Sequence, residues 1–544
     1  MLSDEIKRRD FIKTLIAGVS TLALDWSILP RGAGAQISDN EFDAIIIGSG
    51  LGGLSCAAAF ARQGFRPLVL EKHDRPGGYA TTFTRPGGFE FDVSLHSTTV
   101  GERGGMHNLI PGFPEISEVE FVPHPNLYRI IFPEHDIRVP QRNLPGYIDL
   151  LAGHFPAEKT GIAALFADMQ GLSEDINKFS RAAGQVDMMS FPAEYPHLFN
   201  CYSKTWEQMM AVRLRDPKLK AIVSALWVYY GLPPTQLASI FYALPTLGYL
   251  TGGGFYPRGR SQKISNAFVQ FIEKHGGKVL LNQRVNEILV QDQIAVGVTT
   301  AEGKSYKSRV VISNANAHDT FHTLMKPQPA LGEYLAKMAQ FSVSLSSFQI
   351  FLGLKKDLIN ELGLQDTEIF FESGYDPEAG YRHSRNAEVE NGGFALTLYD
   401  NVYAGYSPKG KNTLTIMTLQ GYDHWQKYEA DYFSNNKAAY RAEKERIADM
   451  LIDKVEQTLL PGLRKAIAVK EIGTPLTNVR YTGNYRGAIY GWDQTLDNSG
   501  PQRLPNATPI KNLYLAGAWT QPGHGYGGVI GSGLQCFGEV MKSW

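Results

Sequence analysis

Glycines at fixed spacing and one acidic residue form the most informative group in this chain of 544 residues. Residues Gly48–Gly53 match the pattern G-x-G-x-x-G. In that pattern Gly48 permits a tight turn, Gly50 lets the backbone approach a pyrophosphate, and Gly53 lets the following helix pack closely on a strand. Glu71 lies about 20 residues further on, where a carboxylate accepts hydrogen bonds from a ribose hydroxyl. These residues predict a dinucleotide site.

The elements that must position these residues can be read on either side of them. Asp43–Ile47 is a short apolar run rich in isoleucine, which predicts a strand buried on both faces of a parallel sheet. Alanine-rich Leu54–Arg62 predicts a helix, and Pro67–Leu70 predicts the next strand. A glycine-rich turn without a ligand is the alternative, but strand, glycines, helix, strand and acid in this order favour the nucleotide site.

Flavin and nicotinamide dinucleotides share this fingerprint, so the choice depends on residues elsewhere in the chain. Near the C-terminus, Asn512–Leu515 predicts a strand that leads into a glycine-rich turn. The segment Gly523–Gly528 then runs into a predicted helix from Val529 to about Met541. A flavin gains negative charge at its pyrimidine end on reduction, and a second glycine-lined helix N-terminus would stabilise that charge. This segment therefore favours a flavin.

The ordered set of motifs resembles the flavin oxidoreductases of the phytoene desaturase, carotenoid isomerase and retinol saturase group, within the amine oxidase-like flavoproteins. The resemblance covers most of the chain. Its matching segments are Gly48–Glu71, Arg75–Gly78, Phe91–Asp92, Tyr256–Gly259, Gly276–Val279 with Val285 and Ile288, Gly473–Pro475, Arg486–Gly491 and Leu515–Gly533. Two positions depart from the group, which often has a second glycine where Arg260 stands and a small residue with glycine around Ser94–His96.

The resemblance implies FAD as the cofactor and names the residues that would hold it. These are Gly48, Gly50, Leu51, Gly52, Gly53, Glu71, Lys72, Arg75, Gly77, Gly78, Val285, Gly517, Ala518, Gly525, Gly527, Gly528 and Val529. For Val285, a contact with the adenine side through the backbone and a plain core position are both open. The candidates for catalysis are His524, Tyr526, His96 and Asp92, and for both histidines a structural role is the alternative.

The expected fold class is α/β, with a Rossmann-like FAD-binding domain and a mixed α+β substrate domain inserted discontinuously. Residues 40–115, 250–325 and 470–544 are expected to form the FAD-binding domain, and residues 116–249 and 326–469 the substrate domain. Within these parts we expect a helix over Ile264–Lys274 and strands over Lys278–Leu281, Val285–Val290, Arg309–Ile312, Ser342–Leu354 and Thr413–Leu419.

The N-terminus has the layout of an export signal. Basic residues in Lys7–Lys13 include the pair Arg8-Arg9, the apolar run Leu15–Leu24 follows, and Ala33-Gly34-Ala35 fits a cleavage site before Gln36. We expect residues 1–35 to be a twin-arginine signal peptide that carries the folded protein through the Tat translocase to the periplasm. Retention of this segment as a membrane anchor is the alternative.

Composition and motif content narrow the chemistry. A net charge of −1 without a basic block gives no basis for nucleic acid binding. The three cysteines, Cys56, Cys201 and Cys536, form neither a Cys-x-x-Cys pair nor a disulfide framework. The histidines lack the spacing of a zinc site, so we expect no catalytic metal. Redox chemistry supplied by a flavin remains.

An apolar and aromatic stretch, Ala225–Leu250, is the most unusual segment of the expected substrate domain. It is too interrupted by glycine and proline to cross a membrane. One interpretation makes it the wall of a tunnel for a long apolar ligand, or a helix that dips into a lipid surface. The other makes it ordinary core of the second domain, which is the commoner role of aromatic residues at helical spacing.

Together these observations and the resemblance predict an exported FAD enzyme that desaturates, saturates or isomerises carbon–carbon double bonds in an apolar, isoprenoid-like substrate. A membrane quinone or another carrier would exchange electrons with it, and peripheral contact with the membrane is consistent with that partner. Two alternatives are open: a flavin amine or amino-acid oxidase on the same scaffold, and a flavin-binding protein without catalytic activity.

Overall fold

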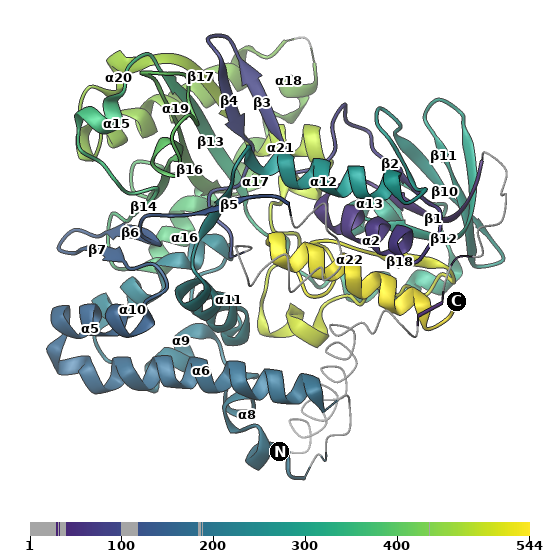
Figure 1. The fold of residues 1–544 in the computed structure, drawn as a ribbon, viewed down its shortest axis with the longest axis horizontal. Coiled ribbons are helices and arrows are strands. Elements are labelled where there is room, and N and C mark those ends of the chain that lie inside the picture. The colour runs from purple at the N-terminus through teal and green to yellow at the C-terminus, as the bar shows by residue number, and fades with distance from the viewer. Residues whose placement is uncertain are drawn as a thin grey trace.

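The chain folds around two sheets and a separate group of helices, as seen in the computed structural model (Figure 1). The structure describes residues 29–30, 32, 40–99, 118–182, 187, 189–434 and 436–544. The expected twin-arginine stretch, its apolar run and the cleavage site lie outside the described residues.

The first sheet carries the predicted dinucleotide motif. Its parallel strands lie in the order β9, β2, β1, β12 and β18, and the β10–β11 hairpin pairs with the beginning of β12. This order brings segments from three distant parts of the chain into one sheet, as the resemblance implied. The strands are β1 (Glu41–Ile47), β2 (Pro67–Leu70), β9 (Lys278–Leu280), β10 (Val285–Gln291), β11 (Ile294–Thr300), β12 (Ser305–Ser313) and β18 (Leu513–Leu515).

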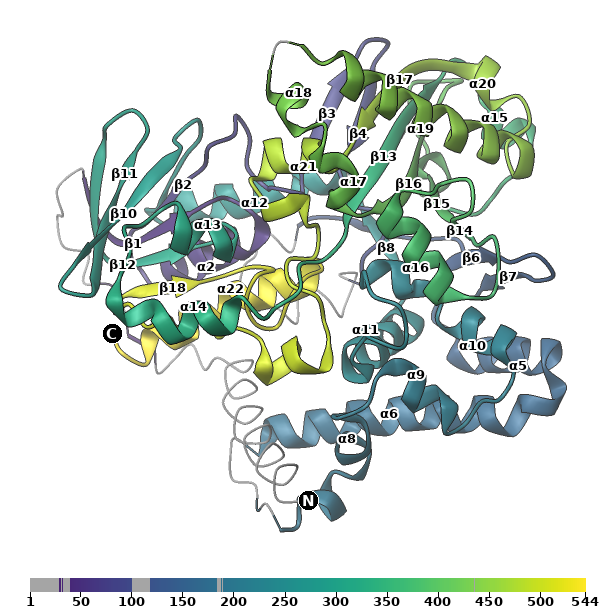
Figure 2. The ribbon, with the colours of Figure 1, turned by 180° about the vertical axis from the view of Figure 1, so that it is seen from behind.

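Alternate side chains of the central strand enter two different cores. Ala44 and Ile46 of β1 pack with helices α2, α12 and α22, whereas Ile45 and Ile47 pack with residues of β10, β11 and α13 on the opposite face. Figure 2 shows α13 and α14 on that second side. Burial on both faces explains why the second half of β1, Ala44–Ile47, is an unbroken apolar run. The helices are α2 (Leu51–Arg62), α12 (Arg260–Lys274), α13 (Ala317–His322), α14 (Gly332–Met338) and α22 (Tyr526–Met541).

The second sheet has seven strands in the order β17, β13, β16, β15, β14, β6 and β7. Neighbours are antiparallel except β14 and β6. Helix α19 (Ala438–Thr458) packs its apolar face on β13 and β16. The strands are β6 (Tyr128–Ile131), β7 (Asp136–Val139), β13 (Ser346–Leu354), β14 (Glu368–Phe371), β15 (Phe394–Leu398), β16 (Asn412–Gln420) and β17 (Ile467–Gly473).

Smaller elements join the two sheets and cover the second one. Two antiparallel strand pairs form separate two-stranded sheets. They are β3 (Thr82–Arg85) with β4 (Phe89–Asp92), and β5 (Phe121–Pro123) with β8 (Phe255–Pro257). Six further short helices follow in the chain: α15 (Leu358–Glu361), α16 (Pro377–Asn386), α17 (Tyr422–Gln426), α18 (Glu429–Phe433), α20 (Leu463–Ala466) and α21 (Pro475–Thr482). The 3₁₀ turns outside the group of helices are η3 (Pro329–Leu331), η4 (Tyr399–Asn401), η5 (Tyr485–Gly487), η6 (Leu496–Asn498) and η7 (Gly500–Gln502).

A group of helices extends from the second sheet, at the lower left in Figure 1. Its core contains many residues of the aromatic stretch Ala225–Leu250, and of the two interpretations the core role is the one observed for buried Tyr230 and Tyr242. The members are α5 (Leu144–His154), α6 (Lys159–Arg181), α7 (Phe191–Glu194), α8 (Pro196–Cys201), α9 (Trp206–Ala211), α10 (Pro217–Val223) and α11 (Ser239–Gly252), with 3₁₀ turns η1 (Pro156–Glu158) and η2 (Ala225–Tyr229).

The α/β fold class is confirmed, and the strands and helices expected from the sequence are present with shifted ends. Helices α2 and α22 both begin three residues earlier than expected, at Leu51 and Tyr526. Glycines that read as turn in the sequence can occupy the first turn of a helix, where amide hydrogens have no partner inside the helix. The sequence did not predict the strands β3, β4, β5, β6, β7, β8, β11, β14, β15 and β17. The division into domains at particular residue numbers stays a prediction.

Among the residues that the structure describes, no helix combines the length and the apolar character needed to cross a bilayer.

Candidate active site

The glycine loop between β1 and α2 is the front of the site, and its glycines leave no room for side chains. Gly48 has a φ of +92°, in the left-handed region, and a Cβ on Gly53 would lie 2.2 Å from the carbonyl oxygen of Gly48. Gly53 therefore allows α2 to begin directly over the end of β1, as the sequence motif predicted.

Helix α2 begins at Gly50 with no side chain capping its first turn. A second turn lies against this one, since the Gly77 amide donates to the Ser49 carbonyl oxygen at 2.9 Å, and a Cβ on Gly78 would stand 3.3 Å from Gly50 Cα. Gly77 and Gly78 have φ values of 121° and 60°. The free amides of α2 and this glycine pair form an anion-binding surface made of backbone.

Glu71 braces the glycine loop from the end of β2. Its Oε2 accepts hydrogen bonds from the Ser49 amide at 2.8 Å and the Ser49 hydroxyl at 2.7 Å, and its Oε1 accepts from the His73 amide at 2.9 Å. The carboxylate thus holds the loop that carries the glycines. The ribose contact predicted for Glu71 stays a prediction.

Other expected cofactor residues surround this turn. Burial lowers the pKa of Lys72, whose Nζ would lie 2.8 Å from a Cβ on Gly483, while Arg75 donates to the carbonyl oxygen of Thr82. Val285 opens β10 opposite Thr300 and is buried in the core of the first sheet. These positions agree with a structural role for each residue, and their contacts with a cofactor stay predictions.

The N-terminus of α22 forms the rear of the site. It begins at Gly525, which has a φ of 84°, and no side chain caps its first turn, which contains Tyr526, Gly527, Gly528 and Val529. Gly517, in the turn after β18, also has a left-handed φ of 96°. This second uncapped helix start matches the one predicted to receive a flavin ring.

The front and the rear meet through glycine contacts. A Cβ on Gly533 of α22 would lie 2.2 Å from the carbonyl oxygen of Gly52, and a Cβ on Gly52 would lie 2.8 Å from Gly517 Cα. Ser55 of α2 donates to the carbonyl oxygen of Ile530 at 3.1 Å, which locks the two helices together. The two uncapped helix starts are consequently parts of one continuous, glycine-lined surface. The Asn314 side chain also lies against this surface, 2.8, 2.7 and 2.6 Å from where a Cβ on Gly50, Gly52 or Gly517 would stand. The backbone amides of the two helix starts and the glycines between them fit a flavin dinucleotide.

His524 lies just before this rear helix, among aromatic rings. Its ring centroid is 4.4 Å from that of Tyr490 and 5.2 Å from that of Phe241. Its Nε2 is 3.2 Å from the carbonyl oxygen of Tyr229, so Nε2 must carry the hydrogen, because a carbonyl oxygen only accepts. Burial, helped by the charge of Arg503, lowers the pKa of His524 to about 3. The ring is neutral, and its buried Nδ1 is an acceptor without a partner.

Asp92 and Tyr526 have different surroundings from His524. The Asp92 carboxylate is buried and accepts hydrogen bonds from Tyr256 Oη at 2.6 Å and from the amide and hydroxyl of Ser261 at 2.9 and 2.5 Å. It therefore caps the first turn of α12. The Tyr526 hydroxyl makes a long contact of 3.4 Å with the carbonyl oxygen of Tyr79. A catalytic role for either residue stays a prediction.

His96 belongs to a buried polar cluster on the second sheet. Its Nδ1 is 2.7 Å from Thr397 Oγ1 and 4.0 Å from Glu368 Oε1. Burial lowers the pKa of His96 to about 4 and raises the pKa of Glu368 to about 8. At neutral pH the histidine is therefore uncharged and the carboxyl group holds its proton.

One tyrosine joins this cluster to His524. Tyr229 donates its hydroxyl hydrogen to Glu368 Oε2 at 2.9 Å, and its backbone carbonyl oxygen contacts His524. Glu368 is 1 % exposed, and its Oε1 has no hydrogen-bond partner in the part of the chain that the structure describes. Nothing in the sequence selected Glu368 as a site residue, and Tyr229 stood out only as part of the aromatic stretch Ala225–Leu250. The one signal for Glu368 was an acidic residue next to the apolar Ile369–Phe371, and a surface strand can carry the same pattern.

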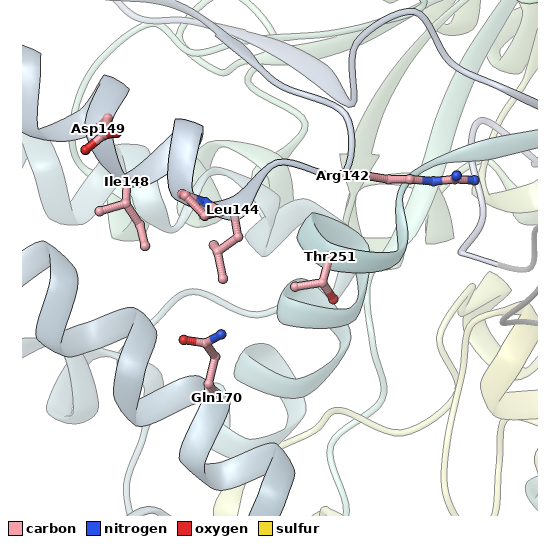
Figure 3. Close-up of a pocket in the computed structure, with 7 residues that line it drawn as sticks. Arg142, Leu144, Ile148, Asp149, Gln170 and Thr251 are labelled. Atoms are coloured by element: carbon pink, nitrogen blue, oxygen red, sulfur yellow. The ribbon is translucent and has the colours of Figure 1, made fainter.

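A separate hollow of about 400 Å³ lies on the group of helices, and Figure 3 shows residues that line it. Leu144 and Ile148 of α5, Gln170 of α6 and Thr251 of α11 line it. It shares no lining residue with the glycine surface or the Glu368 cluster, and we assign it no part in the site.

The fold and the site together define a flavin-dependent oxidoreductase. Residues 51–540 match the family described as flavin containing amine oxidoreductase, and the chain belongs to this family.

Curated relatives resemble the chain over nearly its whole length. An all-trans-retinol 13,14-reductase of Danio rerio is 27% identical over 95% of this chain and 88% of its own length. A chloroplastic prolycopene isomerase of Daucus carota is also 27% identical, over 92% of this chain and 80% of its own. The resemblance stated from the motifs is thereby confirmed.

Solved structures share the fold. Wild-type putrescine oxidase bound to putrescine superposes with a TM-score of 0.60 at 14% identity, covering 92% of this chain and 99% of the other. An oxidoreductase from Methanosarcina mazei superposes with a TM-score of 0.58 at 17% identity, covering 92% and 100%.

Proposed function

We propose that this protein uses FAD to desaturate, saturate or isomerise carbon–carbon double bonds in an apolar, isoprenoid-like substrate. The observation that carries the proposal is the buried, protonated carboxyl group of Glu368, whose Oε1 has no hydrogen-bond partner among the described residues. Tyr229 links Glu368 to His524, which lies just before the rear helix start. An acid in such an apolar setting suits a substrate that offers few polar groups of its own.

FAD fits better than a smaller flavin because the glycine surface has two separated helix starts. The front one, with Glu71 beside it, suits a pyrophosphate and an adenosine ribose, and the rear one suits the ring. The glycines at 48, 50, 52, 53, 517 and 525 carry no side chain over this surface, and three of them, Gly48, Gly517 and Gly525, have φ values in the left-handed region.

When bound, a flavin supplies or accepts a hydride equivalent. For saturation, Glu368 would release its proton from Oε1 to the substrate carbon, and for desaturation the resulting carboxylate would take a proton back. Tyr229 occupies Oε2, so the proton is held at Oε1, which has no hydrogen-bond partner among the described residues and lies 4.0 Å from His96 Nδ1. His524, neutral and with a bare Nδ1, contributes a hydrogen-bond acceptor and not a proton.

Aromatic rings around this acid support an apolar substrate. Tyr229 packs edge to face on Phe370 at 5.3 Å and lies 6.5 Å from the ring of Tyr249. Water is excluded from such a surface, which strengthens the electrostatic effect of any group placed there. The printed names of the two relatives, a retinol reductase and a prolycopene isomerase, point to the same class of substrate.

An amine oxidase is the second candidate, favoured by the family itself and by the ring pair of Tyr490 and Phe241. In this chain, however, both rings contact His524, and Tyr229 links His524 to the buried acid Glu368.

The protein is also proposed to leave the cytosol folded through the Tat translocase, to work in the periplasm in peripheral contact with a membrane, and to exchange electrons with a quinone.

The test uses the full chain purified with its flavin. Under anaerobic conditions, the flavin absorbance is followed with all-trans-retinol, with a cis-configured lycopene and with putrescine, starting from oxidised and from reduced protein. We expect the two polyenes to change the flavin redox state or to be isomerised. Reduction by putrescine with release of hydrogen peroxide in air would establish the amine oxidase instead, and a flavin inert to all three would leave a binding protein.

The matched variants for this test are Glu368→Gln and Glu372→Gln. Burial also raises the pKa of Glu372, to about 7, but Glu372 has no contact with Tyr229 or His524. The proposal requires loss of turnover in the first variant and near-normal turnover in the second. Export is tested separately, by replacing Arg8 and Arg9 with lysine and following the protein between cytosol and periplasm.

A further inference from the structure

Arg503 is a fully buried arginine close to the rear of the site. It is 0% exposed, and it follows the 3₁₀ turn η7. Each of its hydrogen bonds within the described chain ends on a backbone carbonyl oxygen. Nε donates to Thr520 at 3.0 Å, Nη2 to Ala518 at 2.5 Å and to Trp492 at 3.2 Å, and Nη1 to Trp492, Asn498 and Asp493 at 3.2, 3.4 and 3.5 Å.

These bonds join two segments that are distant from α2 in sequence. One is the turn Ala518–Thr520 after β18, which continues from Gly517, the glycine in contact with the front of the site. The other is Trp492–Asn498, and the segments touch, because a Cβ on Gly491 would lie 2.7 Å from the Ala518 carbonyl oxygen. The planar guanidinium therefore fixes the backbone beneath the rear helix start.

Burying the Arg503 charge without a hydrogen-bonded carboxylate costs free energy of folding. A buried cation normally has a hydrogen-bonded carboxylate as partner, and its desolvation costs several kcal/mol or more. Asp493 interacts favourably with Arg503 through its charge, but its carboxylate accepts none of the guanidinium hydrogen bonds. Burial lowers the pKa of Arg503 to about 9, so the group is still charged at neutral pH.

We propose that Arg503 is a positioning residue that holds the flavin-ring side of the site and supplies a fixed positive charge that balances the negative charge of a reduced flavin. This inference rests on the flavin part of the proposed function and is independent of the substrate. Reduction of an oxidised flavin by two electrons and one proton leaves one net negative charge on the ring system. A nearby cation in a medium of low dielectric constant favours that product.

The same charge explains a property of His524. The Arg503 charge adds to burial in keeping the His524 ring neutral, so that its Nδ1 stays an acceptor. A carboxylate bonded to the guanidinium would cancel this influence. The carbonyl acceptors satisfy the N–H groups and leave the charge in place.

The experiment measures sulfite binding and the midpoint potential of the flavin, neither of which needs turnover. Sulfite donates an electron pair to an oxidised flavin ring, a nitrogen–sulfur bond forms, and the displaced electron pair leaves a negative charge on the pyrimidine end. The variants are Arg503→Met, which removes the charge at similar volume, and Arg503→Lys, which keeps the charge and loses the fork. Arg129→Met is the matched control, since Arg129 is a mostly buried arginine paired with Asp366 in the second sheet.

We expect Arg503→Met to weaken sulfite binding at least tenfold and to lower the midpoint potential by about 30 mV, the equivalent of a tenfold change for a two-electron couple. Arg503→Lys should keep sulfite affinity within threefold of wild type while losing thermal stability. Arg129→Met should change stability alone.

Unchanged sulfite affinity in a flavin-loaded Arg503→Met protein would overturn the inference. If that variant does not fold, Arg503→Lys decides, because a tenfold loss of sulfite affinity with the charge retained contradicts the electrostatic role. A wild-type protein that holds no flavin would refute the proposed function itself, so the two failures are distinguishable.

Discussion

The front and the rear of the glycine surface begin alike and end differently. Both start with an uncapped helix N-terminus on glycine. At the front, Glu71 and Ser49 satisfy each other. At the rear, the Nδ1 of His524 and both side-chain polar atoms of Gln494 are buried without hydrogen-bond partners among the described residues, and the charge of Arg503 acts on His524. A buried polar atom without a partner is costly, and at the rear such atoms adjoin the uncapped helix start, which suits a part of the surface that carries out chemistry. The front is built for binding.

The largest effect should come from separating the two parts. In Gly533→Val the first side-chain carbon would lie 2.1 Å from Ser55 Oγ and 2.2 Å from the Gly52 carbonyl oxygen, which is backbone and cannot move away. We expect the free energy of unfolding to fall by about 3 kcal/mol and flavin to be lost. Urea denaturation and the flavin absorbance measure both.

Gly531→Ala is the control in the same helix, because a Cβ at Gly531 meets nothing within 4 Å. Its unfolding free energy should be equal to that of wild type or up to about 1 kcal/mol higher. If Gly533→Val were as stable as this control, the close crossing of α2 and α22 would not hold the two parts together.

The next largest effect is expected at Glu368, the buried acid linked to His524 through Tyr229. Glu368→Gln keeps the size of the side chain and removes its proton, so kcat should fall about 100-fold, with flavin binding unchanged. Because burial raises the pKa of Glu368 to about 8, the wild-type acid is protonated below that pH and activity that needs the proton declines above it. The variant should lose this alkaline limb, measured from the pH dependence of kcat.

The same pKa has a consequence for stability. A carboxyl group whose pKa is higher in the folded state than in the unfolded state stabilises the fold fully below the unfolded pKa, and this contribution is lost as the pH rises through the folded pKa. For Glu368 the loss runs from roughly pH 4.5 to about pH 8. Urea midpoints that decline over this window equally in wild type and Glu368→Gln would contradict the assignment.

A front variant should weaken binding and leave the chemistry alone. In Glu71→Gln one of the two carboxylate oxygens becomes an amide nitrogen, which cannot accept, so either the Ser49 or the His73 hydrogen bonds are lost. Loss of a charge-assisted hydrogen bond costs about 1.5 kcal/mol, so the dissociation constant of FAD should rise about tenfold. Isothermal titration of the apoprotein gives this value. A changed sulfite affinity or pH profile in the flavin-loaded variant would remove the distinction between front and rear.

The smallest effect tests the departure at Arg260. This residue has a φ of 68°, where glycine is favoured, and it is held by Glu90 at 3.0 Å and by the ring of Tyr406 at 4.1 Å. Arg260→Ala loses the contacts and keeps the strain, whereas Arg260→Gly loses both. We expect the glycine variant to be more stable than the alanine variant by about 1 kcal/mol, measured by urea denaturation. Equal stabilities would mean that the backbone is unstrained there.

Sequence patterns were sufficient where neighbours in space are also neighbours along the chain. The unit from β1 to Glu71 and the two glycine-rich turns were located correctly, because turn geometry and helix starts depend on local backbone conformation. Among the strands that escaped prediction, β6, β7, β14 and β15 of the second sheet have only four or five residues each. β6 pairs with β14 through Ile369 and Arg129, which are far apart in sequence, and no local pattern indicates that partner.

The amino-acid sequence alone determined the class of this protein. Glycine spacing dictates where a backbone can approach a dinucleotide, and this spacing can be read without knowing the fold. Only the tertiary structure decided which side chains share the surroundings of that surface. In the folded chain Asp92 caps the first turn of α12, and His96 lies beside Glu368. Backbone carbonyl groups surround the guanidinium of Arg503. The physical reason is that a pKa or an unpaired charge depends on burial and on partners from distant strands, which folding alone brings together.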